Sequence, residues 1–314
     1  MNPLIIIAGP TAVGKSDIAV KLAKDVKGQI ISADSIQVYK GMDIGSAKIA
    51  KDEMGGIKHH LIDVLDPREE FGVNVFQDMS KEAISQIYRD NELPIVVGGT
   101  GFYIQGLLYD IDFNDEEGDK EYRNKLTAMS ELPHGKEKLY DRLKELDPDY
   151  AASLHYNNVK RVIRALEYHK HTGRLFSEYN REQSERKSPY DFIYFALNLP
   201  REELYERIDK RVNIMFDMGL VDEVVALKEK GYTGNLQSMQ GIGYREIWSY
   251  IDGEISLEEA KELIKKNTRH FAKRQLTWLR REKDVIFIDK EKYSGDREII
   301  EYMKDIMRNE GIIQ

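Results

Sequence analysis

The chain has 314 residues, of which 41% are hydrophobic and 32% charged, and its formal net charge is −8. This size predicts one large core, or a core with a smaller domain, and the negative charge argues against a surface that is basic throughout. The absence of cysteine excludes disulfides, zinc-thiolate sites and thiol catalysis. No apolar run approaches the length of a membrane span and no signal-peptide pattern opens the chain, so we expect a cytoplasmic protein without a membrane anchor.

The first apolar run, residues 4–8, predicts a buried strand, and a helical pattern starts near residue 18. Between them, residues 9–16 match the phosphate-binding motif G-x-x-x-x-G-K-[ST], by which many proteins bind nucleotides such as ATP. Free N–H groups at a helix N-terminus favour an anion there. We expect Lys15 to reach the outer phosphates and the Ser16 hydroxyl to bind Mg²⁺. The predicted phosphate-binding loop (P-loop) comprises Gly9, Pro10, Thr11, Ala12, Val13, Gly14, Lys15 and Ser16.

Short β-branched runs alternate with helical patterns along most of the chain. The runs occupy residues 4–8, 29–33, 61–64, 95–97, 192–199 and 285–288. They predict an α/β fold, with a P-loop-containing core whose mainly parallel sheet is flanked by helices. Between residues 114 and 189 the strands stop, and an acidic loop at 115–119 leads into helical patterns. We therefore predict a catalytic core of residues 1–113 and 190–314, interrupted by a helical insertion domain of residues 114–189.

Two polar turns follow predicted strands, at the edge of the sheet where α/β proteins bind ligands. Asp34 ends the second strand and is a candidate general base, although capping a following helix would equally explain its position. Thr100 follows the strand at 95–97, where its hydroxyl could donate to a phosphate or a base; a structural turn is the alternative. That strand, the usual position of a Walker-B carboxylate, ends in Gly98. Ordinary hydrolysis of a nucleoside triphosphate is therefore a weaker hypothesis.

Two later helical patterns carry basic residues. In the helix predicted from residue 201, Arg207 and Arg211 lie one turn apart and could clamp a phosphate, although a solvated position is the more common one. Residues 261–284 contain nine Lys or Arg against three Asp or Glu, with Gln275 as a polar donor. This basic stretch is either a solvated helix face or a surface for RNA.

Taken together, these segments resemble the tRNA dimethylallyltransferases, also called tRNA isopentenyltransferases, over nearly the whole chain. Departures are mild, such as Phe102 where the family often has leucine and Ser46 where it often has threonine. The ordered motifs that carry the resemblance are residues 9–16, 34–39, 41–45, 59–63, 97–101, 164–167, 241–244 and 273–278.

The resemblance implies transfer of a dimethylallyl group from dimethylallyl diphosphate to N6 of adenosine 37 in the anticodon loop of tRNA, with Mg²⁺ as cofactor. It implies that Asp34 takes the proton of the amine and that Thr100 and Arg211 hold the diphosphate and its bridging oxygen. Because no phosphorus is attacked, such a reaction needs no Walker-B carboxylate. The implied tRNA contacts are Asp34, Ser35, Ile36, Gln37, Thr100, Arg123, Lys160, Arg161, Val162, Ile163, Arg164, Lys273 and Arg274.

Three other functions remain open at this point: an adenylate isopentenyltransferase acting on free nucleotide, a small-molecule P-loop kinase, and a non-catalytic P-loop module. The helical insertion and the basic stretch favour a macromolecular acceptor. We expect a monomer that binds the tRNA anticodon stem-loop and dimethylallyl diphosphate.

Overall fold

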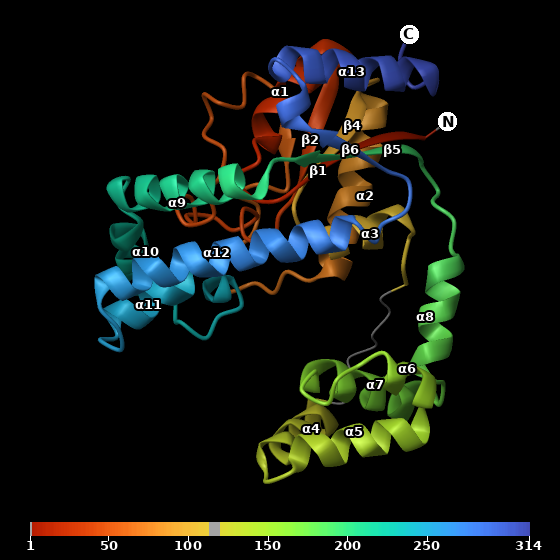
Figure 1. The fold of residues 1–314 in the computed structure, drawn as a ribbon, viewed down its shortest axis with the longest axis vertical. Coiled ribbons are helices and arrows are strands. Elements are labelled where there is room, and N and C mark those ends of the chain that lie inside the picture. The colour runs from red at the N-terminus through yellow and green to blue at the C-terminus, as the bar shows by residue number, and fades with distance from the viewer. Residues whose placement is uncertain (1, 113–119) are drawn as a thin grey trace. The chain divides into compact units, whose positions relative to one another are not determined.

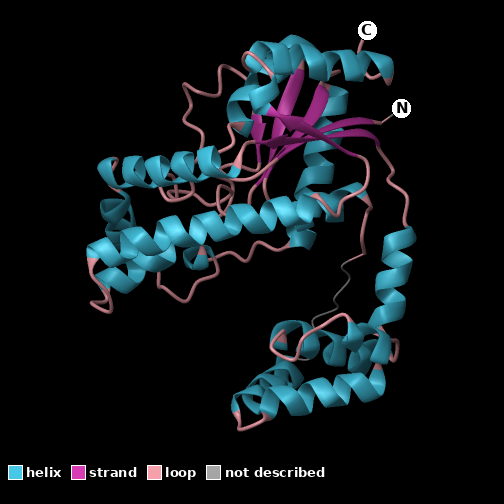
Figure 2. Cartoon of the chain, viewed as in Figure 1, coloured by secondary structure: helices cyan, strands magenta, loops and turns pink. Residues whose placement is uncertain are grey.

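The computed structural model describes residues 2–112 and 120–314 (Figure 1). The chain divides into two compact units, Met1–Leu108 with Pro189–Gln314, and Tyr109–Ser188. The first unit contains the sheet, and the second is helical in its described part (Figure 2). The acidic loop at 115–119 and the expected boundary at residue 114 lie outside the described residues. Within the described ranges, no helix is long and apolar enough to cross a membrane.

The first unit is built on six parallel strands in the order β3-β2-β4-β1-β5-β6. The predicted parallel α/β sheet is confirmed. One strand prediction was wrong, because the strand near residue 61 is instead His59–His60, and positive φ angles of 62° at Leu61 and 55° at Asp63 end it. The strands are β1 (Pro3–Ala8), β2 (Gly28–Ala33), β3 (His59–His60), β4 (Leu93–Gly98), β5 (Asp191–Asn198) and β6 (Val285–Asp289).

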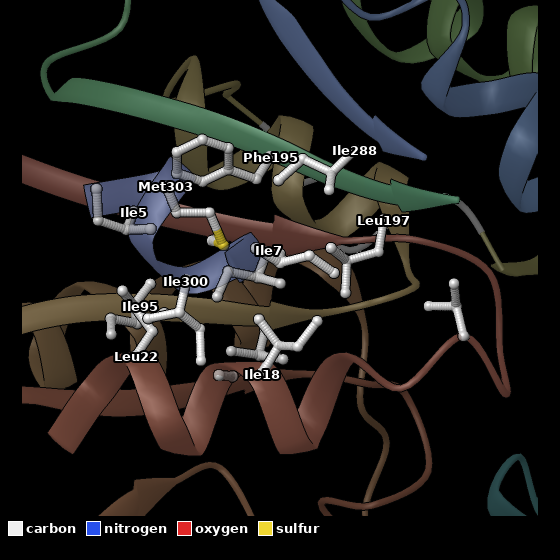
Figure 3. Close-up of a cluster of buried hydrophobic side chains, with 14 of the residues drawn as sticks. Ile5, Ile7, Ile18, Leu22, Ile95, Phe195, Leu197, Ile288, Ile300 and Met303 are labelled. Atoms are coloured by element: carbon white, nitrogen blue, oxygen red, sulfur yellow. The ribbon is translucent and has the colours of Figure 1, made fainter. Parts of the chain in front are cut away.

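Helices of the first unit cover the sheet and extend beyond it. Because alternate strand side chains face opposite sides of a sheet, Ile5, Ile7 and Ile95 share one face, where they join the cluster that also contains Ile18 of α1 and Met303 of α13 (Figure 3). The helices are α1 (Lys15–Val26), α2 (Val73–Arg89), α3 (Gly101–Leu108), α9 (Arg201–Asp217), α10 (Leu220–Glu229), α11 (Tyr244–Ile251), α12 (Leu257–Leu279) and α13 (Asp296–Asn309), with short 3₁₀ turns η1 (Ser238–Gln240) and η2 (Lys290–Lys292).

The second unit has its own small core. Leu126, Leu139, Leu143 and Leu166 are buried together there, with neighbours from α4 to α7. The core explains the apolar face of α7, whose side chains at 162, 163 and 166 are all buried. The helices are α4 (Lys120–Glu131), α5 (Gly135–Leu146), α6 (Pro148–Ala152), α7 (Val159–Thr172) and α8 (Phe176–Glu185).

Candidate active site

The loops that follow three neighbouring strands meet at one edge of the sheet. Ala8 of β1 and Ala33 of β2 both pair with Gly98 of β4, so the segments after these residues begin side by side. They are the P-loop, the turn at Asp34 and the turn at Thr100. A cavity of about 580 Å³ lies there. Its lining residues include Thr11, Ala12, Asp34, Ser35, Ile36, Thr100, Arg211 and Arg274.

The P-loop is closed around its own lysine. Gly14, with φ of 90°, takes the left-handed conformation at the start of α1, which glycine adopts without strain. Lys15 Nζ donates to the Gly9 carbonyl at 3.1 Å and to the Pro10 carbonyl at 2.9 Å. Burial, and to a smaller extent the charge of Arg211, lower the pKa of Lys15 to about 8, and the Asp34 carboxylate acts in the opposite direction. The lysine therefore keeps its proton at neutral pH, and its ammonium lies against the Gly9 and Pro10 carbonyls of the loop.

Asp34 holds a turn and does not cap a helix. Its Oδ1 accepts hydrogen bonds from the backbone N–H of Ile36 at 2.9 Å and of Gln37 at 3.2 Å. No described helix begins here, so the capping interpretation was wrong. Among the described residues, no hydrogen bond is made to Oδ2, and Asp34 belongs to the cavity lining.

Gln37 makes its contacts within the protein. Its Nε2 donates to the carbonyls of Ser46 and Ala47, both at 3.3 Å, and its Oε1 accepts from Ser32 at 3.4 Å. Gln37 is absent from the described cavity lining, whereas Ser35 belongs to it.

Of the two α9 arginines that were candidates for clamping a phosphate, Arg211 lines the cavity and Arg207 is absent from the described lining. Its Nη2 donates to the Ala47 carbonyl at 3.3 Å. Burial lowers the pKa of this guanidinium, and the nearby Asp34 carboxylate is the main opposing charge. Arg207 instead forms a surface pair with Glu203 at 2.9 Å. The solvated position is therefore correct for Arg207 and wrong for Arg211.

Thr100 stands between the sheet and α3. Its backbone N–H donates to the Ala33 carbonyl at 3.3 Å, and its own carbonyl accepts from Tyr103 and Ile104 in the first turn of α3. These bonds fix the backbone of Thr100 beside the residue that precedes Asp34.

The basic stretch forms most of α12, which supplies one wall of the cavity. Arg274 lines the cavity, whereas Lys273 is exposed outside the described lining. Gln275 was expected among the polar donors of an RNA surface. It is instead buried, with 7% of its surface exposed, and faces the P-loop.

The remaining candidate tRNA contacts lie in the second unit. Lys160 and Arg161 of α7 are exposed and Arg164 is partly exposed, whereas Val162 and Ile163 are only 1% and 6% exposed and belong to the core. Arg123 donates to Glu167 Oε2 through Nε at 3.0 Å and through Nη2 at 2.8 Å. Any contact of residues 162 and 163 with RNA would therefore have to be made by their backbone.

One anchoring residue had no signal in the sequence. The Glu223 carboxylate of α10 accepts hydrogen bonds from the backbone N–H of Asp43, Ile44 and Gly45 and from the Tyr244 hydroxyl, at 2.7–3.1 Å. It joins the loop at 41–47 to the segment at 241–244, both of which contribute to the cavity wall. The two segments are motifs of the family resemblance, but the residue that connects them belongs to neither.

Protein side chains alone do not form a metal site here. Within the described ranges, no group of three or more His, Asp or Glu residues could hold a metal ion. A divalent cation at the P-loop would therefore depend on oxygens of the bound substrate and on water, as Mg²⁺ commonly does at phosphate sites.

Comparisons with known proteins identify the family. The IPP transferase model matches residues 37–282. A tRNA dimethylallyltransferase of Lachnoclostridium phytofermentans (strain ATCC 700394 / DSM 18823 / ISDg) is 53% identical over 314 residues, the full length of both chains. The crystal structure of a tRNA isopentenylpyrophosphate transferase from Bacillus halodurans is 41% identical, with a TM-score of 0.73 over 99% of this chain and 98% of that one. A eukaryotic dimethylallyltransferase acting on tRNA is 29% identical, with a TM-score of 0.78 over 98% of this chain and 80% of that one. The chain therefore belongs to the IPP transferase family of tRNA dimethylallyltransferases, enzymes that modify tRNA.

Proposed function

We propose that this enzyme transfers the dimethylallyl group of dimethylallyl diphosphate to the exocyclic N6 of adenosine 37 in the tRNA anticodon loop. The observation that carries the proposal is the presence of Asp34, Thr100 and Arg211 on the wall of one cavity, beside P-loop residues. The allylic C–O bond breaks and the C–N bond forms. Diphosphate leaves, and the amine gives up one proton.

The cationic groups are suited to the departing diphosphate. As the C–O bond breaks, negative charge grows on the diphosphate, and donors already directed at that charge lower the barrier. Lys15 exchanges its bonds to the loop carbonyls for phosphate oxygens. Arg211 lines the cavity together with Thr11 and Ala12 of the P-loop. Thr100 holds the bridging oxygen through its hydroxyl. The P-loop here releases a diphosphate and transfers no phosphoryl group.

Asp34 is the proposed general base. Oδ1 is held by two backbone N–H groups, which fixes the carboxylate and leaves Oδ2 to accept a hydrogen bond from the N6 amine. As the C–N bond forms, the amine becomes acidic and its proton moves to Oδ2. Ser35 lies next to Asp34 on the cavity wall, where it can contact the adenine edge.

Mg²⁺ fits this site as an ion shared with the substrate. Ser16 lies in the first turn of α1, where its side chain is exposed, and its hydroxyl would hold the ion together with diphosphate oxygens. When bound, Mg²⁺ neutralises part of the diphosphate charge. We assign nucleotide or diphosphate binding to the whole loop from Gly9 to Ser16.

We assign catalysis to residues 1–113 and 190–314, and contact with the anticodon stem to the insertion at 114–189. The exposed Lys160 and Arg161 support this assignment, since phosphate contacts dominate affinity for nucleic acids. The target adenosine must leave its stack to enter the cavity, at modest cost in a single-stranded loop. Lys273 and Arg274 of α12 contact the RNA near that point. The enzyme acts as a monomer in the cytoplasm.

A single assay tests the proposal against its rivals. The protein is incubated with Mg²⁺ and dimethylallyl diphosphate labelled in the allyl group, together with either unmodified tRNA or AMP. We expect label in the tRNA, and in N6-(dimethylallyl)adenosine after digestion. Label in AMP but not in tRNA would indicate an adenylate isopentenyltransferase. Phosphoryl transfer from ATP to a small acceptor, without prenyl transfer, would instead indicate a kinase.

A further inference from the structure

Gln275 of α12 connects two loops of the active site. Its Oε1 accepts a hydrogen bond from the Thr11 backbone N–H at 2.9 Å, and its Nε2 donates to the Gly99 carbonyl at 3.0 Å. The two partners are a donor and an acceptor, so they also define the orientation of the carboxamide. One buried side chain thereby joins the P-loop to the glycine turn after β4.

The glycine turn is shaped for this contact. A Cβ atom added at Gly99 would lie only 2.0 Å from Gln275 Nε2, which is far inside any normal contact distance. Only glycine at position 99 lets the turn approach the carboxamide closely enough for the hydrogen bond. The need for glycine here is a packing requirement, since no positive φ is involved.

Both ends of this bridge lead to residues that line the cavity. Thr11 is itself a lining residue. Gly99 precedes Thr100, whose N–H donates to the Ala33 carbonyl at 3.3 Å, next to Asp34. Hydrogen bonds and single peptide links thus connect Gln275 to the proposed diphosphate site and to the proposed general base.

We propose that Gln275 is a positioning residue for the transfer reaction. It fixes the P-loop backbone relative to Thr100 and Asp34, so that donor and acceptor sites keep their separation before substrates bind. The inference depends on the proposed prenyl transfer. In the part of the chain that the structure describes, the Gln275 side chain bonds only to backbone, and its neighbours Phe271 and Arg274 on α12 line the cavity.

Gln275→Glu tests the polarity of the bridge. The glutamate keeps an acceptor for Thr11 but, when ionised, cannot donate to the Gly99 carbonyl and adds a negative charge beside the P-loop. We expect kcat/KM for dimethylallyl diphosphate to fall about 30-fold at pH 8, as for loss of a buried hydrogen bond to a charged or unpaired group. When protonated at lower pH, the carboxyl again donates to Gly99. The ratio of variant to wild-type kcat/KM should therefore rise at least about fivefold between pH 8 and pH 6.

Gln275→Met removes both hydrogen bonds and keeps a similar side-chain volume. Its kcat/KM should fall about as much as that of Gln275→Glu at pH 8, and the ratio to the wild type should not depend on pH. Affinity for tRNA, measured without the allylic donor, should stay within about twofold, because Gln275 is buried and its carboxamide bonds to the backbone of Thr11 and Gly99. The matched control is Thr277→Ala on the same helix, at an exposed position where the hydroxyl donates to the Lys273 carbonyl. This variant should match the wild type.

Wild-type transfer of label to tRNA is measured first, so failure of the proposed function would appear there and not in the variants. With an active wild type, the inference is overturned if both Gln275 variants retain kcat/KM within threefold of it. A pH-independent ratio for Gln275→Glu would also overturn it, and this ratio decides the matter if the methionine variant does not fold.

Discussion

Asp34 illustrates how one carboxylate can serve structure and chemistry through different oxygens. Oδ1 accepts two backbone hydrogen bonds, Oδ2 accepts none from the described residues, and Asp34 lines the cavity. Asp34→Asn should retain the Oδ1 bonds and lose the base. We expect kcat to fall by about 10²–10⁴-fold, while the Kd for dimethylallyl diphosphate changes by less than about threefold. Single-turnover transfer and calorimetric titration measure the two quantities.

The second variant at this position separates the two roles. Asp34→Ala also removes the acceptor for Ile36 and Gln37, so it should lower the melting temperature as well as kcat. If Asp34→Asn transfers the prenyl group at a rate within threefold of the wild type, Asp34 is not the base and its importance is confined to the turn.

The lowered pKa of Lys15 predicts that binding of dimethylallyl diphosphate depends on pH. Its pKa is lowered to about 8, and only the protonated amine attracts the diphosphate. At pH 9 about one-tenth of the ligand-free enzyme keeps this proton, so the Kd for dimethylallyl diphosphate should rise about tenfold between pH 7 and pH 9. Titration calorimetry in buffers of different ionisation enthalpy should also detect proton uptake on binding at pH 8.5.

The control for this prediction is Lys15→Met. It should bind the donor weakly at all pH values and show no tenfold rise between pH 7 and pH 9. A constant Kd for the wild type over that range would mean that the Lys15 ammonium does not titrate there or does not contribute to binding.

At the scale of elements, sequence patterns predicted those strands, loops and helices whose conformation depends on residues close together in the chain. Strand β1, the P-loop and α1 follow from an apolar run, a spaced motif and a helical period. The strand predicted at 61–64 was wrong because its apolar residues fill a turn with left-handed backbone at Leu61 and Asp63. No local pattern distinguishes an apolar turn from a short buried strand.

Contacts between distant elements were beyond the reach of sequence patterns. Gln275 looked like part of a basic surface because its neighbours are charged, but its partners lie 264 and 176 residues away. Arg207 and Arg211 are the same residue type and lie one turn apart on α9. Only the packing of this helix places Arg207 in a surface ion pair and Arg211 on the cavity wall. The sequence predicted which residue types stand at strand ends, but not which side chains of the later helices meet them.

Glu223 shows most clearly how one side chain on a helix holds a distant loop. Its carboxylate accepts three backbone N–H bonds from residues 43–45 and one from the Tyr244 hydroxyl. Glu223→Ala should leave these donors unpaired and lower the free energy of unfolding by about 2–3 kcal/mol. Tyr244→Phe removes only one donor and should cost about 1 kcal/mol. Urea denaturation measures both, and hydrogen exchange should accelerate at amides 43–45 in the first variant.

Glu229→Ala on the same helix is the control for a general effect on α10, since Glu229 is exposed. If it destabilises the protein as much as Glu223→Ala, the loss comes from the helix and not from the loop at 43–45.

At the scale of the whole molecule, an acidic protein presents local basic surfaces. The net charge is −8, yet α12 carries a basic stretch and α7 exposes Lys160 and Arg161. Long-range repulsion from the acidic remainder is screened beyond about 8 Å at physiological ionic strength. Local clusters can therefore bind phosphates while the overall charge limits non-specific association with nucleic acid.

The contrast between local basic clusters and a negative net charge predicts how binding to tRNA depends on salt. If Lys160 and Arg161 each neutralise one phosphate, the double change Lys160→Gln and Arg161→Gln should reduce the slope of log K against log salt by about 1.4–1.8. Affinity for tRNA should fall at least about tenfold at low salt, whereas the Kd for dimethylallyl diphosphate should not change. Filter binding at several salt concentrations measures the slope.

The matched control removes two positive charges from α5 of the same unit, through Lys138→Gln and Lys144→Gln, both at exposed positions. Because the net charge changes equally in the two double variants, a diffuse electrostatic attraction would weaken tRNA binding equally in both. A local interface on α7 reduces the slope only in the first pair. Equal slopes for the two pairs would place the RNA elsewhere and leave the basic face of α7 as solvated surface.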